Sequence, residues 1–135
     1  MMKAKMWLVV SVIVLSFLCL DACSDKNGKD GSFTYEQISA KEAKEIMDTQ
    51  KDYIIIDART ESEFAEGHIE GAILIPEYEI ADRAESELPD KDALILVYCR
   101  SGRRSKIASE ELVRLGYTNV KEFGGIIDWP YDTVK

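Results

Sequence analysis

The sequence predicts an α/β domain built on an open parallel sheet of about five strands, with helices on both faces. Two continuous apolar runs, Tyr53 to Asp57 and Leu94 to Tyr98, have the length and β-branched content of strands that are covered on both sides. A segment of helical periodicity follows each run, as in parallel sheets whose strands are joined by helical crossovers. Ligands of such sheets bind at the edge where the strands end, so functional residues are expected there.

The remaining elements are separated by clear start and stop signals. Ser39 and Thr60 each begin a capping box, which marks the first turn of a helix. Pro76 cannot continue a strand and stops the apolar segment before it. In chain order the expected elements are an edge strand at 33–35, a helix from Ser39 to about Asp48, a short helix from Thr60 to Gly67, a strand at 72–75, an amphipathic helix at 77–88 and a last strand at 119–123.

Residues 1–22 are expected to be a targeting segment that does not belong to the fold. Two lysines precede an apolar run from Trp7 to Leu20, which is shorter than a membrane span of about 20 residues. The stretch from Leu20 to Cys23 resembles a bacterial lipoprotein cleavage box, except that Asp21 stands where a small or apolar residue is usual. We expect lipid attachment at Cys23, with an uncleaved anchor or a plain secretory signal as alternatives.

Residues 23–32 are polar and are expected to form a flexible tether, which leaves residues 33–135 as one domain. The expected location is the extracytoplasmic side of a bacterial membrane, either periplasmic or at the cell surface. Cys19 would be lost with the leader and Cys23 would carry lipid, so Cys99 would be the one free thiol. Outside the cytoplasm such a thiol is oxidised or used, which favours a chemical role for Cys99.

The loop that follows the second apolar run carries the strongest functional signal. Cys99 is followed by Arg100, Ser101, Gly102, Arg103, Arg104 and Ser105, and Ser105 is expected to begin a helix with its C-terminal cap at Gly116. Positive charge and a nearby helix N-terminus lower the pKa of a thiol, and the thiolate is the nucleophile. Backbone amides of a short loop form an anion-binding nest, and arginines add forked donors. The sequence therefore predicts an anion pocket with a nucleophile at its floor.

Two alternatives stand beside this interpretation. Cys99 could be a small buried core residue with solvated arginines beside it, as is common for a single cysteine after an apolar strand. Asp57 and Arg59, at the end of the other apolar run, either line the pocket or form a polar pair that braces the turn.

Charge and composition exclude several classes of partner. Hydrophobic residues make up 46% and charged residues 31% of the chain, as in an ordinary globular protein. The net charge of −8 argues against a nucleic-acid partner, because phosphate binding needs a basic face. One histidine and no further cysteine in the domain provide no metal site, and we expect no cofactor. Contact with a membrane is expected only through the lipid anchor, and the oligomeric state is left open.

The segment from Cys99 to Ser105 resembles the active-site loop of the rhodanese family, the single-domain sulfurtransferases whose cysteine carries a persulfide cradled by loop amides. Two further motifs resemble that family at its usual spacing, and together the three span Phe33 to about Trp129. The first comprises Ile54 to Arg59, Glu63-Phe64, Gly67-His68-Ile69, Gly71-Ala72 and Ile75-Pro76, and the closing one comprises Gly124-Gly125 and Trp129.

The resemblance implies a rhodanese-like fold and transfer of a sulfane sulfur from thiosulfate, or a related small anion, to a thiol or to cyanide. Cys99 would be the nucleophile and residues 100–105 the substrate-binding loop, with Asp57 and Arg59 in support. It also implies that His68 belongs to a structural turn and is not a base for Cys99. The alternatives are a phosphatase or arsenate reductase of related fold, whose pattern has arginine where this chain has Ser105, and a non-catalytic binding module, which typically lacks the cysteine.

Overall fold

The computed structural model describes residues 34–135, so the expected leader, the tether and the lipidation site at Cys23 lie outside the described residues. No helix within residues 34–135 is long and apolar enough to cross a membrane. These residues contain a five-stranded sheet whose hydrogen-bonded neighbours are all parallel, in the order β1-β5-β4-β2-β3. The strands are β1 (Glu36–Gln37), β2 (Tyr53–Asp57), β3 (Ile73–Leu74), β4 (Leu94–Cys99) and β5 (Val120–Gly125).

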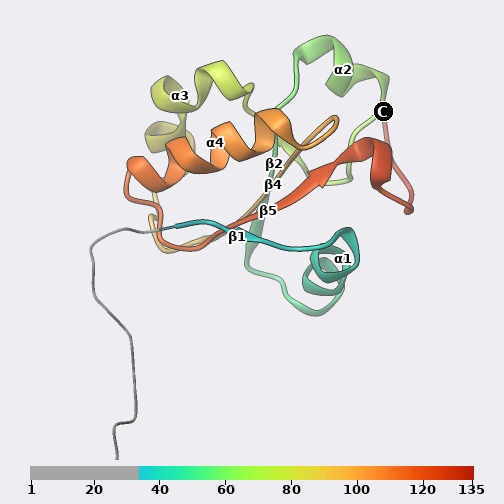
Figure 1. The fold of residues 1–135 in the computed structure, drawn as a ribbon, viewed down its shortest axis with the longest axis horizontal. Coiled ribbons are helices and arrows are strands. Elements are labelled where there is room, and N and C mark those ends of the chain that lie inside the picture. The colour runs from blue at the N-terminus through green and yellow to red at the C-terminus, as the bar shows by residue number, and fades with distance from the viewer. Residues whose placement is uncertain (1–33) are drawn as a thin grey trace, which may run out of the picture. The chain divides into compact units, whose positions relative to one another are not determined.

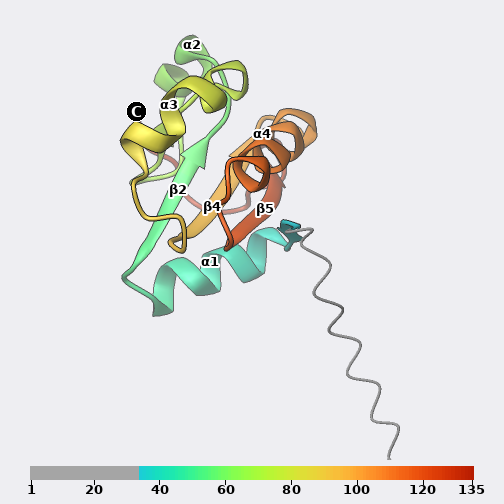
Figure 2. The same cartoon turned by 90° about the vertical axis from the view of Figure 1, so that its left-hand side faces the viewer.

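Helices cover both faces of the sheet, as the sequence predicts. Figures 1 and 2 show α2, α3 and α4 on one face and α1 on the other. The helices are α1 (Ala40–Thr49), α2 (Glu61–Glu66), α3 (Ile80–Glu87) and α4 (Arg103–Arg114), with short 3-10 turns at Glu77–Glu79 and Ile126–Asp128. The α/β class with an open parallel sheet is therefore confirmed.

The central strand β4 sends alternate side chains into two separate apolar cores. Ile95, Val97 and Cys99 belong to the core beneath α3 and α4, whereas Leu96 and Tyr98 belong to the core beneath α1. Every residue of β4 is buried, which explains its uninterrupted apolar sequence. Burying one aliphatic side chain of this size stabilises a fold by about 1.5 to 3 kcal/mol. The alternation places Cys99 on the α4 side of the sheet.

The helix caps that the sequence predicts are present in the structure. At Ser39 and Thr60 the hydroxyl accepts a hydrogen bond from the backbone amide three residues on, and Glu42 and Glu63 complete the two capping boxes. Gly116 has a φ of 97° just after α4, which is the left-handed conformation of a helix C-terminal cap.

Four element boundaries differ from the expectation. The edge strand is Glu36–Gln37 rather than 33–35, because pairing with β5 sets its register and the Ile38 amide extends that pairing to the Glu122 carbonyl. The helix expected at 77–88 is a 3-10 turn followed by α3. The last strand runs to Gly125, past the irregularity between β4 and β5. Finally, α4 begins at Arg103 rather than Ser105, because Gly102 turns the chain with a φ of 102°.

Candidate active site

Cys99 is the last residue of β4 and a free cysteine, and only 1% of it is exposed. Its sulfur lies among polar groups although it is buried. The backbone amide of Gly102 donates a hydrogen bond to Sγ over 3.0 Å, and Ser105 Oγ lies 3.4 Å from the same sulfur. The interpretation of Cys99 as a purely apolar core residue does not account for these contacts.

The loop reaches this geometry because Gly102 takes a left-handed conformation, in which residues with a side chain are strained. That conformation returns the backbone over the sulfur and starts α4 at the next residue. The free amides of the first helical turn and the positive end of the helix dipole therefore lie beside Cys99. Strand, loop and helix therefore form the continuous turn that the sequence predicts, with the sulfur at the start of the helix.

Burial and hydrogen bonding act on Cys99 in opposite directions. Burial raises the pKa of the thiol, but hydrogen bonds with Ser105 and from the amides of Gly102 and Ser101 lower it by more. The net effect holds the pKa of Cys99 below its ordinary value. The site therefore favours the thiolate, which is the nucleophilic form.

The closing glycine pair holds the loop from below. The irregular pairing of β4 and β5 sets Gly125 opposite Cys99. A Cβ atom on Gly125 would lie 2.0 Å from the carbonyl oxygen of Arg100 and 2.6 Å from the Cα of Ser101. The Ile127 amide then donates to the Arg100 carbonyl over 3.2 Å. The backbone of the cysteine loop therefore lies directly against Gly125, where a side chain would not fit.

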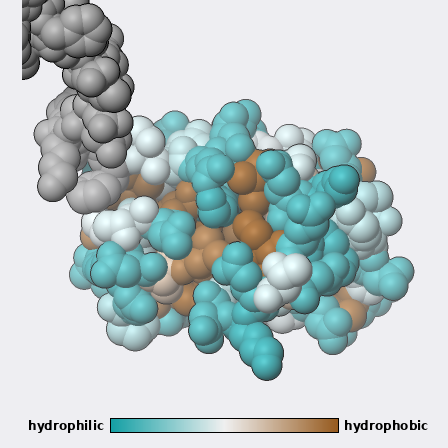
Figure 3. All heavy atoms as spheres, turned by 90° about the horizontal axis from the view of Figure 1, so that it is seen from below, coloured by the Kyte–Doolittle hydropathy of each residue, from teal (hydrophilic) through white to brown (hydrophobic). Residues whose placement is uncertain are grey.

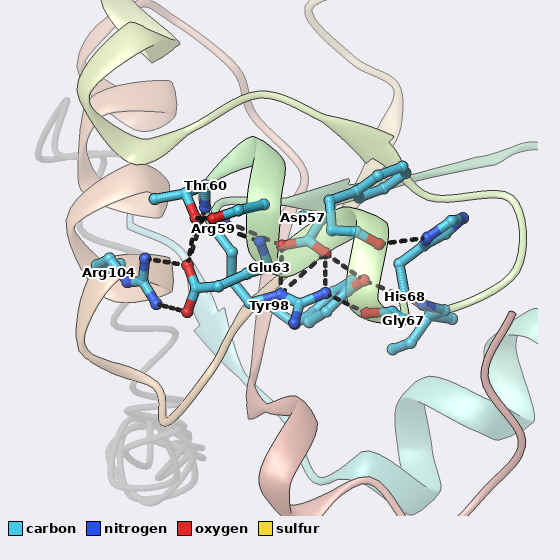
Figure 4. Close-up of polar contacts among 11 residues, drawn as sticks. Asp57, Arg59, Thr60, Glu63, Gly67, His68, Tyr98 and Arg104 are labelled. Carbon is cyan, nitrogen blue, oxygen red and sulfur yellow. Dashed lines mark hydrogen bonds and ion pairs between the residues drawn. The ribbon is translucent and has the colours of Figure 1, made fainter. Parts of the chain in front are cut away.

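The three arginines of the loop have different environments. Arg104 gives both terminal nitrogens to the carboxylate of Glu63 on α2, over 2.8 Å each, as Figure 4 shows. Its guanidinium contributes positive charge near Cys99, but these donors are engaged. The side chains of Arg100 and Arg103 are exposed and form no hydrogen bond or ion pair within residues 34–135. They are the two arginines of the loop whose donors all remain available to an anion.

Asp57 and Arg59 form a buried pair that braces the turn between β2 and α2. The guanidinium of Arg59 binds Asp57 and also donates to the carbonyl of Gly67, each over 2.7 Å at its shortest. Tyr98 donates its hydroxyl to Asp57 over 2.7 Å and accepts the amide of Ile69 (Figure 4). Burial and the Asp57 charge raise the pKa of Tyr98. This network anchors the end of β2 to β4.

His68 makes local contacts only. Its ring stacks on that of Phe64 with centroids 3.7 Å apart, and its Nδ1 lies 2.9 Å from the Phe64 carbonyl oxygen. Its backbone forms an isolated antiparallel bridge with Val134. These contacts fit the structural turn that the resemblance implies.

Two residues of the site, Tyr98 and Glu122, were not predicted from the sequence. The tyrosine ends a buried apolar run, and a buried phenol usually finds a partner, which was the available signal. Glu122 is only 3% exposed, and its Oε1 lies 2.6 Å from Ser105 Oγ. An acidic residue between Lys121 and Phe123 looks like an ordinary exposed strand position, so the sequence held no usable signal for it.

Cavities lined by the described residues occur away from Cys99. One of about 560 Å³ lies beside α1 and is lined by Met47, Ile69, Trp129 and their neighbours. Another of about 730 Å³ lies at the opposite end of the strands from Cys99, around Tyr53 and Leu94. Figure 3 shows the α1 face, where apolar side chains are visible between polar ones. Cys99 lines neither of these two cavities.

Comparison with known proteins gives a consistent result. The family model of the rhodanese-like domain matches residues 39–130. A thiosulfate sulfurtransferase of Escherichia coli strain K12, PspE, is 40% identical over 80 residues, which cover 59% of this chain and 77% of that protein. A sulfurtransferase of Allochromatium vinosum is 42% identical over 85 residues, covering 62% of this chain and 77% of that protein.

Solved structures agree with these relatives. A rhodanese with anions from E. coli matches with 38% identity and a TM-score of 0.58, over 62% of this chain and 98% of that one. The rhodanese-like domain of an Anabaena protein matches with 29% identity and a TM-score of 0.69, over 75% of this chain and 80% of that one.

The Glu63–Arg104 ion pair predicts a pH-dependent stability. The Arg104 guanidinium holds the pKa of Glu63 at about 2 against an ordinary 4.5, so the pair stabilises the fold fully above about pH 4.5 and loses that effect as the pH falls toward 2. Glu63→Gln is expected to lower the free energy of unfolding by about 1 kcal/mol at neutral pH. Urea unfolding at a series of pH values should show the difference shrinking below pH 4.5. A difference that does not change with pH would contradict this, and Glu110→Gln, at an exposed position of α4, is the control.

The close approach at Gly125 predicts a large cost for any side chain there. Gly125→Ala places Cβ inside the backbone of Arg100 and Ser101 and is expected to cost about 3 kcal/mol of unfolding free energy. Gly116→Ala is the matched control, because Gly116 also has a positive φ but its Cβ would meet nothing within 4 Å. That control is expected to cost about 1 to 2 kcal/mol. Equal costs in urea unfolding would mean that the cysteine loop does not rest on Gly125.

Proposed function

Because this chain belongs to the rhodanese-like domain family, we propose that it moves a sulfane sulfur from thiosulfate, or a related small anion, to a thiol or to cyanide through a persulfide on Cys99. Membership of this family, and relatives named as sulfurtransferases, support sulfur transfer as the general activity. The observation that carries the proposal is the Gly102 amide on the Cys99 sulfur, at the start of α4. This contact favours an ionised sulfur where an anion also binds.

In the first displacement the Cys99 thiolate attacks the outer sulfur of thiosulfate. A bond forms between Sγ and that sulfur, the bond between the two sulfurs of thiosulfate breaks, and sulfite leaves with the electron pair. The thiolate and the thiosulfate dianion carry three negative charges, as do the resulting persulfide anion and the sulfite dianion. No proton, oxidant or metal is required.

Positive groups of the loop offset this concentration of negative charge. The amides at the start of α4 and the helix dipole act on the sulfur itself. The unengaged guanidinium groups of Arg100 and Arg103 are suited to hold the oxygens of the donor and then of sulfite. Arg104, already bound to Glu63, adds positive charge and fixes α4 to α2. The chain is acidic overall, which makes this loop a local positive site.

In the second displacement an acceptor attacks the outer sulfur of the persulfide. The new bond joins the acceptor to that sulfur, and Cys99 leaves as the thiolate from which the cycle began. Cyanide gives thiocyanate, and a thiolate gives a new persulfide. Because donor and acceptor react in turn with one cysteine, the expected kinetics are ping-pong.

Access to the sulfur requires a small movement of the loop. Cys99 is 1% exposed, whereas Arg100 and Ser101, which follow it, are exposed. On its inner side the backbone of these two residues lies against Gly125. On the solvent side both residues are exposed, so the loop can shift outward without displacing a packed layer. We propose that donor binding to Arg100 and Arg103 accompanies this opening.

Removing the sulfur of Cys99 tests the proposal directly. Cys99→Ser is expected to lower thiocyanate formation from thiosulfate and cyanide at least about a thousandfold, because the serine hydroxyl cannot form the persulfide. Mass spectrometry of the full chain after thiosulfate treatment and digestion should show one added sulfur on the peptide that contains Cys99. Cys23→Ser is the matched control and should keep both activity and the added sulfur.

The same assay separates the rival functions. Turnover of an aryl phosphate by the unmodified chain, without thiosulfate turnover, would support the phosphatase class. Uptake of sulfur from none of a panel of sulfane donors would support a binding module. Either result would overturn the proposed sulfur transfer.

A further inference from the structure

The carboxylate of Glu122 is buried beneath the cysteine loop, and the mechanism above makes no use of it. Glu122 is 3% exposed and pairs across the sheet with Val97, so its side chain lies on the same face as Cys99. It forms no ion pair within residues 34–135. Burying a carboxylate without a counter-ion costs free energy of folding, so this one is expected to have a role at the reactive loop.

Glu122 is held by two hydrogen bonds from the loop region. Its Oε1 lies 2.6 Å from Ser105 Oγ and accepts the amide of Gly124 over 2.8 Å. Ser105 Oγ lies 3.4 Å from the Cys99 sulfur on its other side. One hydroxyl oxygen therefore stands between a carboxylate and the nucleophile.

The hydroxyl of Ser105 has one hydrogen and several acceptors around it. Besides Oε1 of Glu122, these are the carbonyl of Gly102 at 3.1 Å, the Cys99 sulfur at 3.4 Å and the carbonyl of Gly124 at 3.4 Å. A carboxylate is the strongest acceptor of this set and lies closest. While Glu122 is ionised, the hydrogen belongs to it, and Ser105 presents a lone pair to the sulfur.

We propose that Glu122 is a positioning residue for Cys99, whose carboxylate takes the Ser105 hydrogen and so withholds it from the sulfur. This inference rests on the proposed role of Cys99 as the nucleophile. The hydroxyl lowers the pKa of Cys99 only when its hydrogen turns to the sulfur, whereas the loop amides lower it at all times. The carboxylate charge acts in the same sense as the lost hydrogen bond, because a nearby anion disfavours a thiolate.

The buried and half-buried charged groups around the two residues are paired, whereas Arg100 and Arg103 of the loop are exposed and unpaired within residues 34–135. On α4, Arg104 is the cation whose charge acts on Cys99, and it is bound to Glu63 of α2. On β2, Asp57 is bound to Arg59. On β5 itself, Lys121 is bound to Glu36 of β1. Glu122 is thus a buried charge near Cys99 without a counter-ion in the described part of the chain, so its removal should lower the pKa of Cys99.

The functional consequence is that the reactivity of the Cys99 nucleophile is held below its maximum. With the Ser105 hydrogen on Glu122, the loop amides of Ser101, Gly102 and Ser105 hold the sulfur, and the thiolate fraction stays lower than the loop could give. The pair Ser105 and Glu122 therefore adjusts the reactivity of Cys99 without any contact between the carboxylate and the substrate.

The test follows the ionisation of Cys99 without any sulfur donor. The rate of iodoacetamide alkylation of the Cys99 peptide is measured by mass spectrometry against pH for the full chain and its variants. Glu122→Gln keeps the size of the side chain and an acceptor for Gly124, and is expected to move the midpoint down by about one pH unit. Glu110→Gln removes a charge at an exposed position of α4 and should leave the midpoint unchanged. A change in access alone would alter the limiting rate at high pH and leave the midpoint in place.

Ser105→Ala provides the second, independent arm. If Glu122 holds the hydrogen, loss of the hydroxyl does not raise the midpoint, because the sulfur was not receiving that hydrogen bond. A raised midpoint in Ser105→Ala, or an unchanged or raised one in Glu122→Gln, would overturn the inference. The alkylation midpoints of both variants are measured without a sulfur donor. A failure of the proposed sulfur transfer would therefore leave these midpoints unaffected.

Discussion

The hydrogen bond from the Gly102 amide to the Cys99 sulfur is the constraint on which the rest of the site depends. A thiol that is 1% exposed would ordinarily be held neutral by burial. Here the backbone turns back over the sulfur within three residues, so donors that cannot be lost by mutation of a side chain lie next to it. Their effect, with that of Ser105, outweighs burial and lowers the pKa of Cys99.

Much of the surrounding structure serves to keep that turn in place. Gly102 supplies the left-handed conformation, and Gly125 lets β5 pass directly beneath Arg100 and Ser101. Arg104 ties the first turn of α4 to Glu63, while Asp57 and Arg59 lock the neighbouring turn through Tyr98. These contacts come from β2, α2, β4, α4 and β5. A loop of seven residues is thus held from several sides.

The sequence was sufficient for the fold and for the identity of the loop, because those depend on local patterns. Continuous apolar runs, capping boxes at Ser39 and Thr60, and a cysteine followed by basic residues all lie within short windows. It failed where the outcome depends on contacts between distant segments. Arg104 was expected to face an anion and instead binds Glu63, which lies 41 residues away. Glu122 lies on the face of β5 that also carries Val120 and binds Ser105, 17 residues away, which no local pattern shows.

These misses share a physical cause. Charged residues in the sequence look alike whether they are exposed or paired, and pairing is decided by packing. The resemblance to the rhodanese family located the site, and the family is shown by the match over residues 39–130. What the structure adds is the distribution of charge: two unengaged arginines on the surface of the loop, one arginine bound to a carboxylate, and one carboxylate beneath the nucleophile.

The proposed sulfur transfer requires that the folded loop stabilise the ionised sulfur of Cys99. The most direct test of this requirement is the titration of Cys99 itself. Carbon-13 labelling of cysteine Cβ in the full chain, with the Cys99 signal assigned by its loss in Cys99→Ser, gives the pH at which this thiol loses its proton. The account predicts a midpoint below about 8.5, the value of a free thiol, in the native protein and a return to that value on unfolding in urea. A native midpoint at or above 8.5 would contradict it, because the amides of the loop would then not be stabilising the thiolate.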